Sequence, residues 1–379
     1  MTIHWIGTGL SAIPGLRRLL QSDAKVTVWN RTEAKARAEL GDLSNDIRAY
    51  SFDALEKAVG PGDIIVSMLP ADQHVALARL AIAAGAHFIS SSYIAPEMAA
   101  LDDAARDAGV VLMNEVGLDP GIDHLMAHDL VADYKHEAAR PGDVIRFGSY
   151  CGGVPKHPNP FRYKFSWSPL GVLRALRSPS KSLRGGEVRD VARPWDAIEP
   201  YDAPLPVPER FEVYPNRDSL PFMTQYGFDP DWDVQDFVRG TLRLKGWKDA
   251  WAPVFAEVET LSGPVGEERL REMADQFWRD NAYATNEPDR VVLFVALQAE
   301  RDGETVWHKE WVLDAQGNEK GSAMAQLVSV PVSLAVQAVA EGRIAPGVHA
   351  APDDPQLVAD WLVEIGQIAQ HLAKVDHLR

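Results

Sequence analysis

The stretch that decides the fold is Ile3-His4-Trp5-Ile6-Gly7-Thr8-Gly9-Leu10-Ser11-Ala12, which continues through a helical pattern to Val26-Thr27-Val28-Trp29-Asn30-Arg31. Gly7 allows a sharp turn out of a strand, Gly9 allows backbone to approach a pyrophosphate, and Ala12 is small enough for helix and strand to pack. The helix N-terminus that follows favours an anion through its unpaired N–H groups and its dipole. The stretch therefore predicts a dinucleotide site, with cofactor contacts at Gly7, Gly9, Leu10 and Ser11.

The end of the second strand indicates which dinucleotide is bound. NAD-binding proteins usually place Asp or Glu there to hold the ribose 2′-hydroxyl, whereas this chain has Asn30, Arg31 and Thr32. These side chains can hold a 2′-phosphate, so the sequence predicts NADP, with NAD as the alternative. A glycine turn can join any strand to any helix, and arginine after a strand is common. The strand, helix and second strand in the required order favour the cofactor site.

The length, composition and net charge of the chain limit the classes of protein to which it can belong. With 379 residues and 46% hydrophobic content, the chain is long enough for two domains of an ordinary globular protein. We expect neither a signal peptide nor a membrane span, and hence a cytoplasmic protein. The single Cys151 excludes an intrachain disulfide and a thiolate metal cluster, and no metal site is predicted. The net charge of −16 argues against general nucleic-acid binding.

Residues 1–118 alternate short apolar strands with amphipathic helices, which predicts a doubly wound parallel sheet of the Rossmann type, covered on both faces. Small or polar residues follow several strands, and ligands bind outside the carboxyl ends of such strands. Helix capping explains any one of them equally well, but their shared position favours a site. Strands are expected at 3–6, 25–29, 47–50, 63–68, 86–90 and 110–114, with cofactor contacts at Ser67, Met68, Leu69, Pro70 and Ser91 and substrate contacts at Ser92 and Tyr93.

Beyond Gly117 the chain becomes richer in Trp, Pro and Gly, with alternating runs such as 146–150 and 291–297. These runs are typical of a mixed or antiparallel sheet, and we predict an α+β domain over residues 119–322 for substrate binding and dimerisation. Helical patterns return in residues 323–379, including a terminal helix from Pro355 to Val375. We expect this tail to pack back on the Rossmann domain.

Five motifs in the second part of the chain are rich in polar residues and glycine. They are Gly117-Leu118-Asp119-Pro120-Gly121, Tyr150-Cys151-Gly152-Gly153, Phe165-Ser166-Trp167-Ser168, Pro215-Asn216-Arg217-Asp218-Ser219 and Arg239-Gly240-Thr241-Leu242-Arg243. Together with Ser91-Ser92-Tyr93, these motifs resemble the saccharopine reductase family, the glutamate-forming saccharopine dehydrogenases. The resemblance runs over nearly the whole chain, and a chance match to all five motifs in one order is implausible.

The resemblance implies an oxidoreductase that acts on a CH–NH group with NAD(P) in lysine metabolism. It would interconvert saccharopine with L-glutamate and 2-aminoadipate 6-semialdehyde. In such a reaction a hydride leaves the carbon next to a secondary amine, and water attacks the resulting imine. The site then needs a group that accepts the amine proton and cations for three carboxylates. The expected partners are these small molecules and a second copy of the chain in a homodimer, without nucleic acid or membrane.

Three cations are candidates for the carboxylates. Arg217 is the first choice, because a guanidinium binds a carboxylate through two parallel hydrogen bonds; a surface ion pair with Asp218 is the alternative. Arg243 and Lys164 come second, and each is as well explained by solvation. The remaining substrate candidates are the Thr241 hydroxyl and Trp167, which either walls the cavity or belongs to an ordinary core.

For proton transfer the candidates are Asp119, Tyr93 and Cys151. Asp119 stands just before Pro120 and a predicted helix, so capping that helix is its alternative role. Cys151 is as well explained as a small buried residue. The sequence leaves the identity of the base open among these three.

Two other functions stay open. One is a related carboxyalkyl-amine dehydrogenase of the carboxynorspermidine type, which would need an acidic residue in place of one arginine. The presence of both Arg217 and Arg243 favours saccharopine over that substrate. The other is a non-catalytic NADP-binding sensor, which would bind the cofactor without turning over a substrate.

Overall fold

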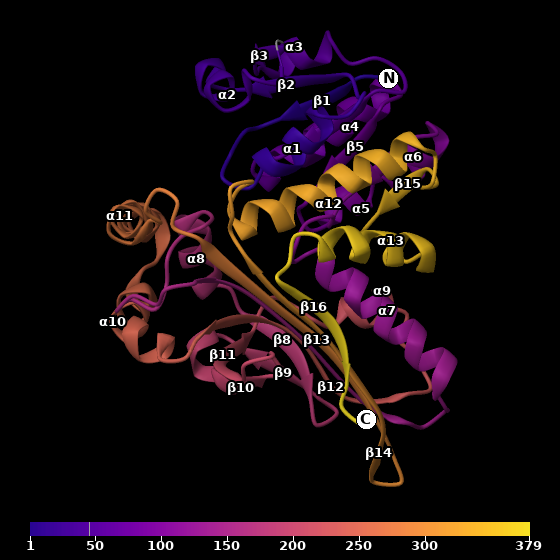
Figure 1. The fold of residues 1–379 in the computed structure, drawn as a ribbon, viewed down its shortest axis with the longest axis vertical. Coiled ribbons are helices and arrows are strands. Elements are labelled where there is room, and N and C mark those ends of the chain that lie inside the picture. Colours follow the sequence, from indigo (N-terminus) through magenta and orange to yellow (C-terminus); the bar gives the residue numbers. More distant parts are fainter. Residues whose placement is uncertain (45) are drawn as a thin grey trace. The chain divides into compact units, whose positions relative to one another are not determined.

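The computed structural model describes residues 1–44 and 46–379, which form two compact units (Figure 1). Unit 1 consists of residues 1–125 and 325–365, and unit 2 of residues 126–324 and 366–379. Each unit is built on its own β-sheet, with seven strands in unit 1 and nine in unit 2. The chain passes from unit 1 to unit 2 within helix α7 (Ile122–Glu137).

The sheet of unit 1 is parallel throughout, with strand order β15-β6-β5-β4-β1-β2-β3. Six of these strands follow the Rossmann order 3-2-1-4-5-6, and the order reverses between β1 and β4. The six predicted strands are confirmed to within a residue at each end, while β15 was not predicted. The strands are β1 (Ile3–Ile6), β2 (Val26–Asn30), β3 (Ile47–Ala49), β4 (Ile64–Ser67), β5 (His87–Ser90), β6 (Val111–Met113) and β15 (Gly347–His349).

The longer helices of unit 1 bury apolar side chains at helical spacing, such as Leu16 and Leu19 of α1 and Leu77 and Ala81 of α4. Helix α1 begins directly after the fingerprint loop, with Pro14 in its first turn, where a missing N–H costs no hydrogen bond. The helices are α1 (Ile13–Leu20), α2 (Glu33–Leu40), α3 (Phe52–Glu56), α4 (His74–Ala84), α5 (Pro96–Ala99), α6 (Asp102–Asp107), α12 (Ala323–Ala340) and α13 (Pro355–Gly366), with a 3₁₀ turn at Ala71–Gln73.

Helix α12 lies beside α1 (Figure 1), and the two approach closely at Gly15. The Gly15 N–H donates a hydrogen bond to Ser329 Oγ at 2.8 Å. By length and by its mean hydropathy of 1.6, α12 is apolar enough to cross a membrane. However, 78% of this helix is buried inside the protein, as expected for a core helix.

Replacing Gly15 with alanine should destabilise unit 1, because the new Cβ would stand 1.9 Å from the Ser329 carbonyl oxygen. Overpacking costs about 1–3 kcal/mol. This exceeds the roughly 0.5–1 kcal/mol that alanine gains over glycine within a helix. Gly60→Ala is the control, since its Cβ would meet nothing closer than Asp63 Oδ2 at 3.7 Å. Thermal unfolding should show a lower Tm for Gly15→Ala alone; equal melting of the two variants would disprove the tight contact.

The sheet of unit 2 is mixed, as predicted, with β7 and β12 parallel and the other neighbouring strands antiparallel. Its main order is β10-β11-β12-β7-β13-β14-β16, and β8 and β9 branch from β12. The strands are β7 (Val144–Pro155), β8 (Ser180–Arg184), β9 (Glu187–Val191), β10 (Glu199–Ala203), β11 (Glu209–Pro215), β12 (Asp233–Leu244), β13 (Asp289–Arg301), β14 (Glu304–Gln316) and β16 (His371–Asp376).

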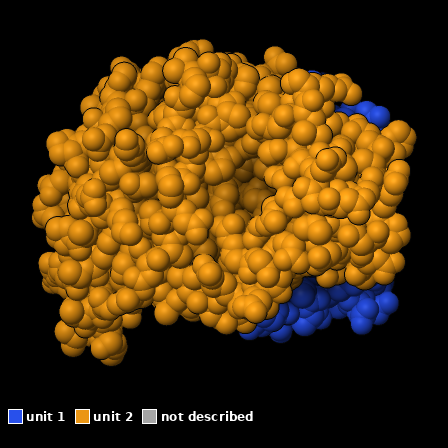
Figure 2. Space-filling model, turned by 90° about the horizontal axis from the view of Figure 1, so that it is seen from below, with its two compact units in different colours: residues 1–125, 325–365 blue, residues 126–324, 366–379 orange. Residues whose placement is uncertain are grey.

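The sheet of unit 2 is curled. Tyr201 of β10 packs on Phe294 of β13 with ring centroids 5.3 Å apart, although three strands separate β10 from β13 in the sheet order. Figure 2 shows the surface of unit 2, in orange, hollowed in the middle of the view. The inner face carries a core that includes Phe294 and Val312. The outer face carries the helices, with Trp311 of β14 bonded to Asp129 of α7. These helices are α7, α8 (Pro169–Leu176), α9 (Pro221–Gln225), α10 (Trp247–Thr260) and α11 (Gly263–Asn281).

The predicted terminal helix from Pro355 to Val375 is wrong in its second half. Helix α13 ends at Gly366, and β16 pairs antiparallel with β14. Along β16 the side chains alternate: Val375 joins the inner core, whereas Lys374 forms ion pairs with α7 on the outer face. A period of two is typical of a strand, but in six residues it is easily mistaken for a continued amphipathic helix.

Candidate functional site

The fingerprint loop of unit 1 has the shape and the donors that a diphosphate requires. Gly7 adopts a φ of 100°, which other residues rarely reach, and its N–H bonds the Trp29 carbonyl at 2.8 Å. A Cβ on Gly9 would meet no atom within 4 Å, so the backbone there is open to a ligand. Thr8 is buried, and its Oγ1 has no hydrogen-bond partner among the residues that the structure describes. This unused hydroxyl next to an exposed glycine backbone fits a phosphate group.

The residues at the end of β2, which are expected to distinguish NADP from NAD, are hydrogen-bonded to the fingerprint loop. Asn30 Oδ1 accepts a hydrogen bond from the Thr8 N–H at 3.3 Å, and Asn30 Nδ2 donates to the Thr32 carbonyl at 2.9 Å. Asn30 therefore braces the loop against the end of β2. Arg31 and Thr32 are exposed at that strand end, where a group on the ribose can reach them.

The predicted residues after β4 and β5 lie at the switch point of the sheet or next to it. Met68 packs on Gly7, since its carbonyl oxygen lies 3.3 Å from where a Gly7 Cβ would stand. Ser67 is buried and its Oγ accepts from the Leu69 N–H, and Pro70 precedes the 3₁₀ turn. Ser91 contacts Gly117, and the Ser92 carbonyl accepts from the Glu115 N–H at 3.0 Å. The ends of β1, β4, β5 and β6 thus form one polar edge.

Tyr93 and Asp119 are brought together although 26 residues separate them: the tyrosine hydroxyl donates to Asp119 Oδ1 at 2.9 Å. Asp119 precedes a cis peptide bond to Pro120 and lies before the first residue of α7, Ile122. The first-turn carboxylate that accepts a nearby backbone N–H is that of Asp123, from Gly121 at 2.7 Å. Asp119 therefore presents its carboxylate to Tyr93.

A buried histidine lies between two carboxylates beside this pair. His124 Nε2 is 3.0 Å from Glu115 Oε2, and its Nδ1 is 3.5 Å from Asp123 Oδ2. Glu115 has a φ of 56°, unusual for a residue with a side chain, and its Oε1 accepts from the Ile94 N–H at 2.9 Å. The loop after β5 and the loop after β6 are therefore fixed to one another through Glu115.

In unit 2, the β-sheet register places Cys151, Thr241 and Tyr214 side by side on the outer face. Thr241 pairs with Cys151 on one side and with Tyr214 on the other. Cys151 is buried and Thr241 half-buried. Arg243 lies two residues beyond Thr241 on the same strand and so on the same face. Three of the predicted site residues, Cys151, Thr241 and Arg243, are thus neighbours in unit 2.

Three aromatic rings surround Arg243, and we call them the aromatic box. Its guanidinium carbon lies 5.0 Å from the ring centre of Tyr163, 5.4 Å from that of Trp247 and 5.7 Å from that of Tyr214. The side chain is only 6% exposed. Nη1 donates to the Leu242 carbonyl. Within the described ranges, Nε has no hydrogen-bond partner and no carboxylate forms an ion pair with Arg243. Burial raises the pKa of the Tyr214 hydroxyl, and the Arg243 charge opposes that shift.

The other predicted cations are placed differently. Arg217 is exposed in the turn after β11, at a φ of 58°, and its carbonyl accepts from the Lys181 N–H. Lys164 forms an ion pair with Glu287 at 2.6 Å, so its charge is already balanced. Trp167 donates from its ring nitrogen to the Tyr163 hydroxyl at 3.2 Å and so belongs to the wall of the aromatic box.

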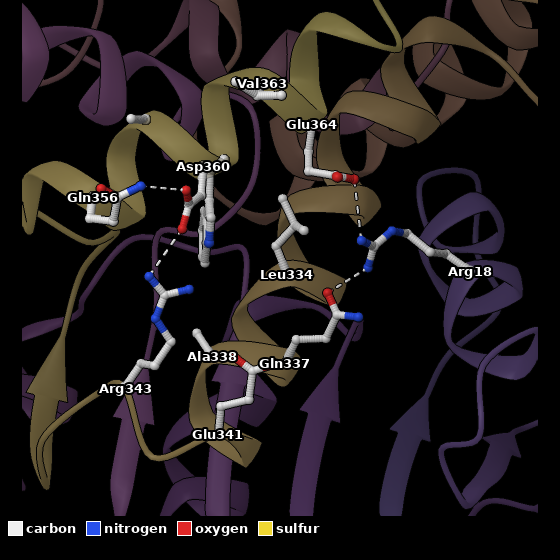
Figure 3. A pocket seen from close by; sticks show the side chains of 12 residues that line it. Arg18, Leu334, Gln337, Ala338, Glu341, Arg343, Gln356, Asp360, Val363 and Glu364 are labelled. Carbon is white, nitrogen blue, oxygen red and sulfur yellow. Dashed lines mark hydrogen bonds and ion pairs between the residues drawn. The ribbon is translucent and has the colours of Figure 1, made fainter.

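A pocket of about 480 Å³ in unit 1 lies between α1, α12 and α13 (Figure 3). Arg18 of its wall is in the last turn of α1, at the opposite end of that helix from the fingerprint loop. Arg18 bonds Gln337 and Glu364, and Arg343 bonds Asp360. Because these charges are paired within the wall, the pocket is not the dinucleotide site.

Sequence reasoning assigned no role to two polar residues of these regions, Thr8 and Ser166. Ser166 is buried, and its Oγ, near Gly153, has no hydrogen-bond partner among the described residues, as is the case for Thr8 in the fingerprint loop. Both residues lie inside motifs whose neighbouring residues were predicted to be in the site, and that position was the signal available. Glu115 follows β6, one of the strands whose polar ends favour a site, but sequence reasoning assigned it no specific role.

Two family models match the chain. Residues 3–113 match the saccharopine dehydrogenase NADP binding domain, and residues 117–368 match the saccharopine dehydrogenase C-terminal domain. Among solved structures, the apo histidine-tagged saccharopine dehydrogenase (L-Glu forming) from Saccharomyces cerevisiae is 26% identical, with a TM-score of 0.82 over 99% of each chain. A homospermidine synthase from Legionella pneumophila, 12% identical with a TM-score of 0.65, shares the fold.

Curated relatives include the saccharopine dehydrogenase [NADP(+), L-glutamate-forming] of Pyricularia oryzae and that of Schizosaccharomyces pombe. The first is 38% identical over 256 residues, which are 65% of this chain and 55% of the relative. The second is 36% identical over 265 residues, 65% of this chain and 56% of the relative. The matched part of the chain thus spans about half the length of these relatives.

Proposed function

The chain belongs to the saccharopine dehydrogenase family, and on this premise we propose that it interconverts saccharopine with L-glutamate and 2-aminoadipate 6-semialdehyde. NADP, when bound, accepts or returns the hydride of the carbon next to the amine. The observation that carries the proposal is Arg243, a buried guanidinium without a carboxylate partner in the described ranges. Burying an unpaired charge is costly, and a substrate carboxylate would relieve that cost through two parallel hydrogen bonds.

For the cofactor, the proposal uses the polar edge of unit 1. Backbone N–H groups at Gly9 and Leu10, with the Thr8 and Ser11 hydroxyls, would hold the diphosphate at the start of α1. Arg31 and Thr32 would hold the 2′-phosphate, with Asn30 fixing the loop between them. The residues after β4 and β5, among them Met68 and Ser91, would line the path toward the nicotinamide.

For the chemistry, Asp119 would accept the amine proton as the amine is oxidised to the imine, with Tyr93 orienting its carboxylate. Water would then add to the imine carbon, and breakdown of the carbinolamine would release glutamate and the semialdehyde. In unit 2, Arg243 and Arg217 would bind carboxylates of the substrate, with Thr241 next to Arg243, and in unit 1 Ser92 is a further candidate for a substrate contact. Trp167 would exclude bulk water, and Cys151, beside Thr241, is the second candidate for proton transfer.

The test is NADPH oxidation with glutamate or other amines and a panel of aldehydes, compared with cofactor binding alone. We expect turnover with 2-aminoadipate 6-semialdehyde and not with aldehydes that lack its carboxylate. Turnover with an amine that lacks glutamate's two carboxylates would favour the carboxynorspermidine type. Cofactor binding without turnover of any pair would favour a sensor.

Arg31→Ala should weaken NADP binding much more than NAD binding. Loss of one charge-assisted contact to the 2′-phosphate corresponds to about 1.5–3 kcal/mol, or roughly 10- to 150-fold in Kd. Because Arg31 is exposed, its removal leaves no buried group unpaired. Fluorescence titration of both cofactors measures the effect, with Arg48→Ala as a control from the neighbouring strand. Equal losses for both cofactors would remove Arg31 from the specificity site.

The remaining proposals concern the cellular compartment and the oligomeric state of the enzyme. We propose a cytoplasmic homodimer that acts on small molecules, on the basis of the single cysteine, the acidic net charge and the α+β second domain. Light scattering of the purified chain tests the dimer.

A further inference from the structure

Two histidines and one glutamate meet where β14 and β16 pair in unit 2. His308 and Glu310 are two residues apart on β14 and so lie on one face of the sheet. His377 directly follows β16, and its backbone N–H donates to the His308 carbonyl at 3.0 Å. The pairing of the two strands therefore fixes the positions of all three residues.

Their side chains converge. One ligand atom from each of the three lies within 4.8 Å of the other two. His377 Nε2 is 2.9 Å from Glu310 Oε2, and the rings of His308 and His377 stack with centroids 4.1 Å apart. Around a tetrahedral zinc ion, with bonds of about 2.0–2.2 Å, ligand atoms are roughly 3.4 Å apart. Small side-chain rotations would therefore bring the three atoms into one coordination sphere.

Glu310 is buried and hydrogen-bonded, as metal-ligating carboxylates commonly are. Its side chain is only 6% exposed, and a buried carboxylate needs a compensating charge. The Tyr201 hydroxyl donates to Oε1, which leaves Oε2 toward His377. A hydrogen bond on the second oxygen fixes the orientation of a ligating carboxylate. His377 remains partly exposed, at 28% of its side chain, so an ion can enter from solvent.

We propose that His308, Glu310 and His377 bind one divalent transition-metal ion of the zinc type, with water completing its coordination. Imidazole nitrogen with carboxylate oxygen suits zinc, whereas calcium and magnesium prefer oxygen ligands alone. The site is structural, because it ties β16 to β14 on the inner face of the sheet. Cys151 and Leu313 lie in one cross-strand row on the outer face of the sheet. His308 and Glu310 lie on the inner face, because neighbouring residues of a strand face opposite sides, so the metal site is on the other face from Cys151.

The experiment is a zinc titration of the full chain, freed of metal with EDTA, by isothermal calorimetry and thermal unfolding. Wild type should bind one ion per chain, and zinc should raise its Tm, because a ligand that binds only the folded state stabilises it. His377→Gln and His308→Gln should weaken binding at least about tenfold and abolish the Tm shift. His371→Gln, at the other end of β16, is the matched control and should bind as wild type does.

His377 is exposed enough that its replacement should leave the fold intact, which the Tm without zinc checks independently. Tyr201→Phe keeps all three ligands and should weaken zinc binding by roughly 10-fold, through the lost orientation of Glu310. Equal zinc binding by wild type and His377→Gln, or no binding by either at micromolar zinc, would leave only a histidine–glutamate ion pair and overturn the proposal. Saccharopine turnover should be the same in His377→Gln and wild type.

Discussion

Arg243→Met should reduce kcat/KM for saccharopine by about 10²-fold or more, with NADP binding unchanged. A bidentate, charge-assisted contact to a substrate carboxylate corresponds to about 3 kcal/mol, and methionine keeps an unbranched apolar chain in place of the aliphatic part of arginine, without the charge. Steady-state kinetics with saccharopine as the varied substrate measures the loss. Arg243→Lys should restore little of it, because a lysine lacks the planar pair of donors.

Two controls separate binding from packing. The Arg243 guanidinium has no carboxylate partner among residues 1–44 and 46–379, so its replacement by methionine should not lower the Tm of the free protein. A large fall in Tm would assign Arg243 to the aromatic core. Arg217→Met, at the exposed arginine, is the matched variant. A greater kinetic loss in Arg217→Met than in Arg243→Met would make Arg217 the principal carboxylate contact.

Asp119→Asn should lower kcat by roughly 10²-fold or more, since general acid–base contributions are typically of that size. The variant retains the Tyr93 contact, because the asparagine oxygen can still accept from the tyrosine hydroxyl. Its Tm should therefore stay close to that of wild type. Measuring kcat and thermal unfolding on the same preparation distinguishes a chemical role from a structural one, and near-normal turnover would remove Asp119 as the base.

Tyr93→Phe is the companion of that experiment. It removes the hydrogen bond to Asp119 and keeps the carboxylate. We expect a smaller loss of kcat than in Asp119→Asn, because the base remains and only its orientation is less defined. A larger loss in Tyr93→Phe would give the proton-transfer role to the tyrosine.

The sequence predicted the parallel sheet of unit 1 well because its strands are short apolar runs buried on both faces, with helices between them. It failed at β16, where six residues alternate too briefly to be distinguished from a continued helix. The strand forms because β14 offers an edge with which it can pair, and that edge is far away in the sequence.

The sequence singled out the motifs of the candidate site, but it could not tell which of their residues are buried. Arg217 was placed before Arg243 because of its motif, yet Arg243 is the buried one. Its burial depends on the nearby Trp247 and on Tyr163, which comes from a distant part of the chain. The partner of Asp119 was equally hidden, since Tyr93 approaches it only through the ends of neighbouring strands.

The most direct test of the proposed function is the rate of NADPH formation by the purified chain with saccharopine and NADP, with the products identified by mass spectrometry. The account predicts NADPH in equal amounts with glutamate and 2-aminoadipate 6-semialdehyde. NADPH formation from saccharopine with other products, or no NADPH from saccharopine while the chain binds NADP, would contradict it.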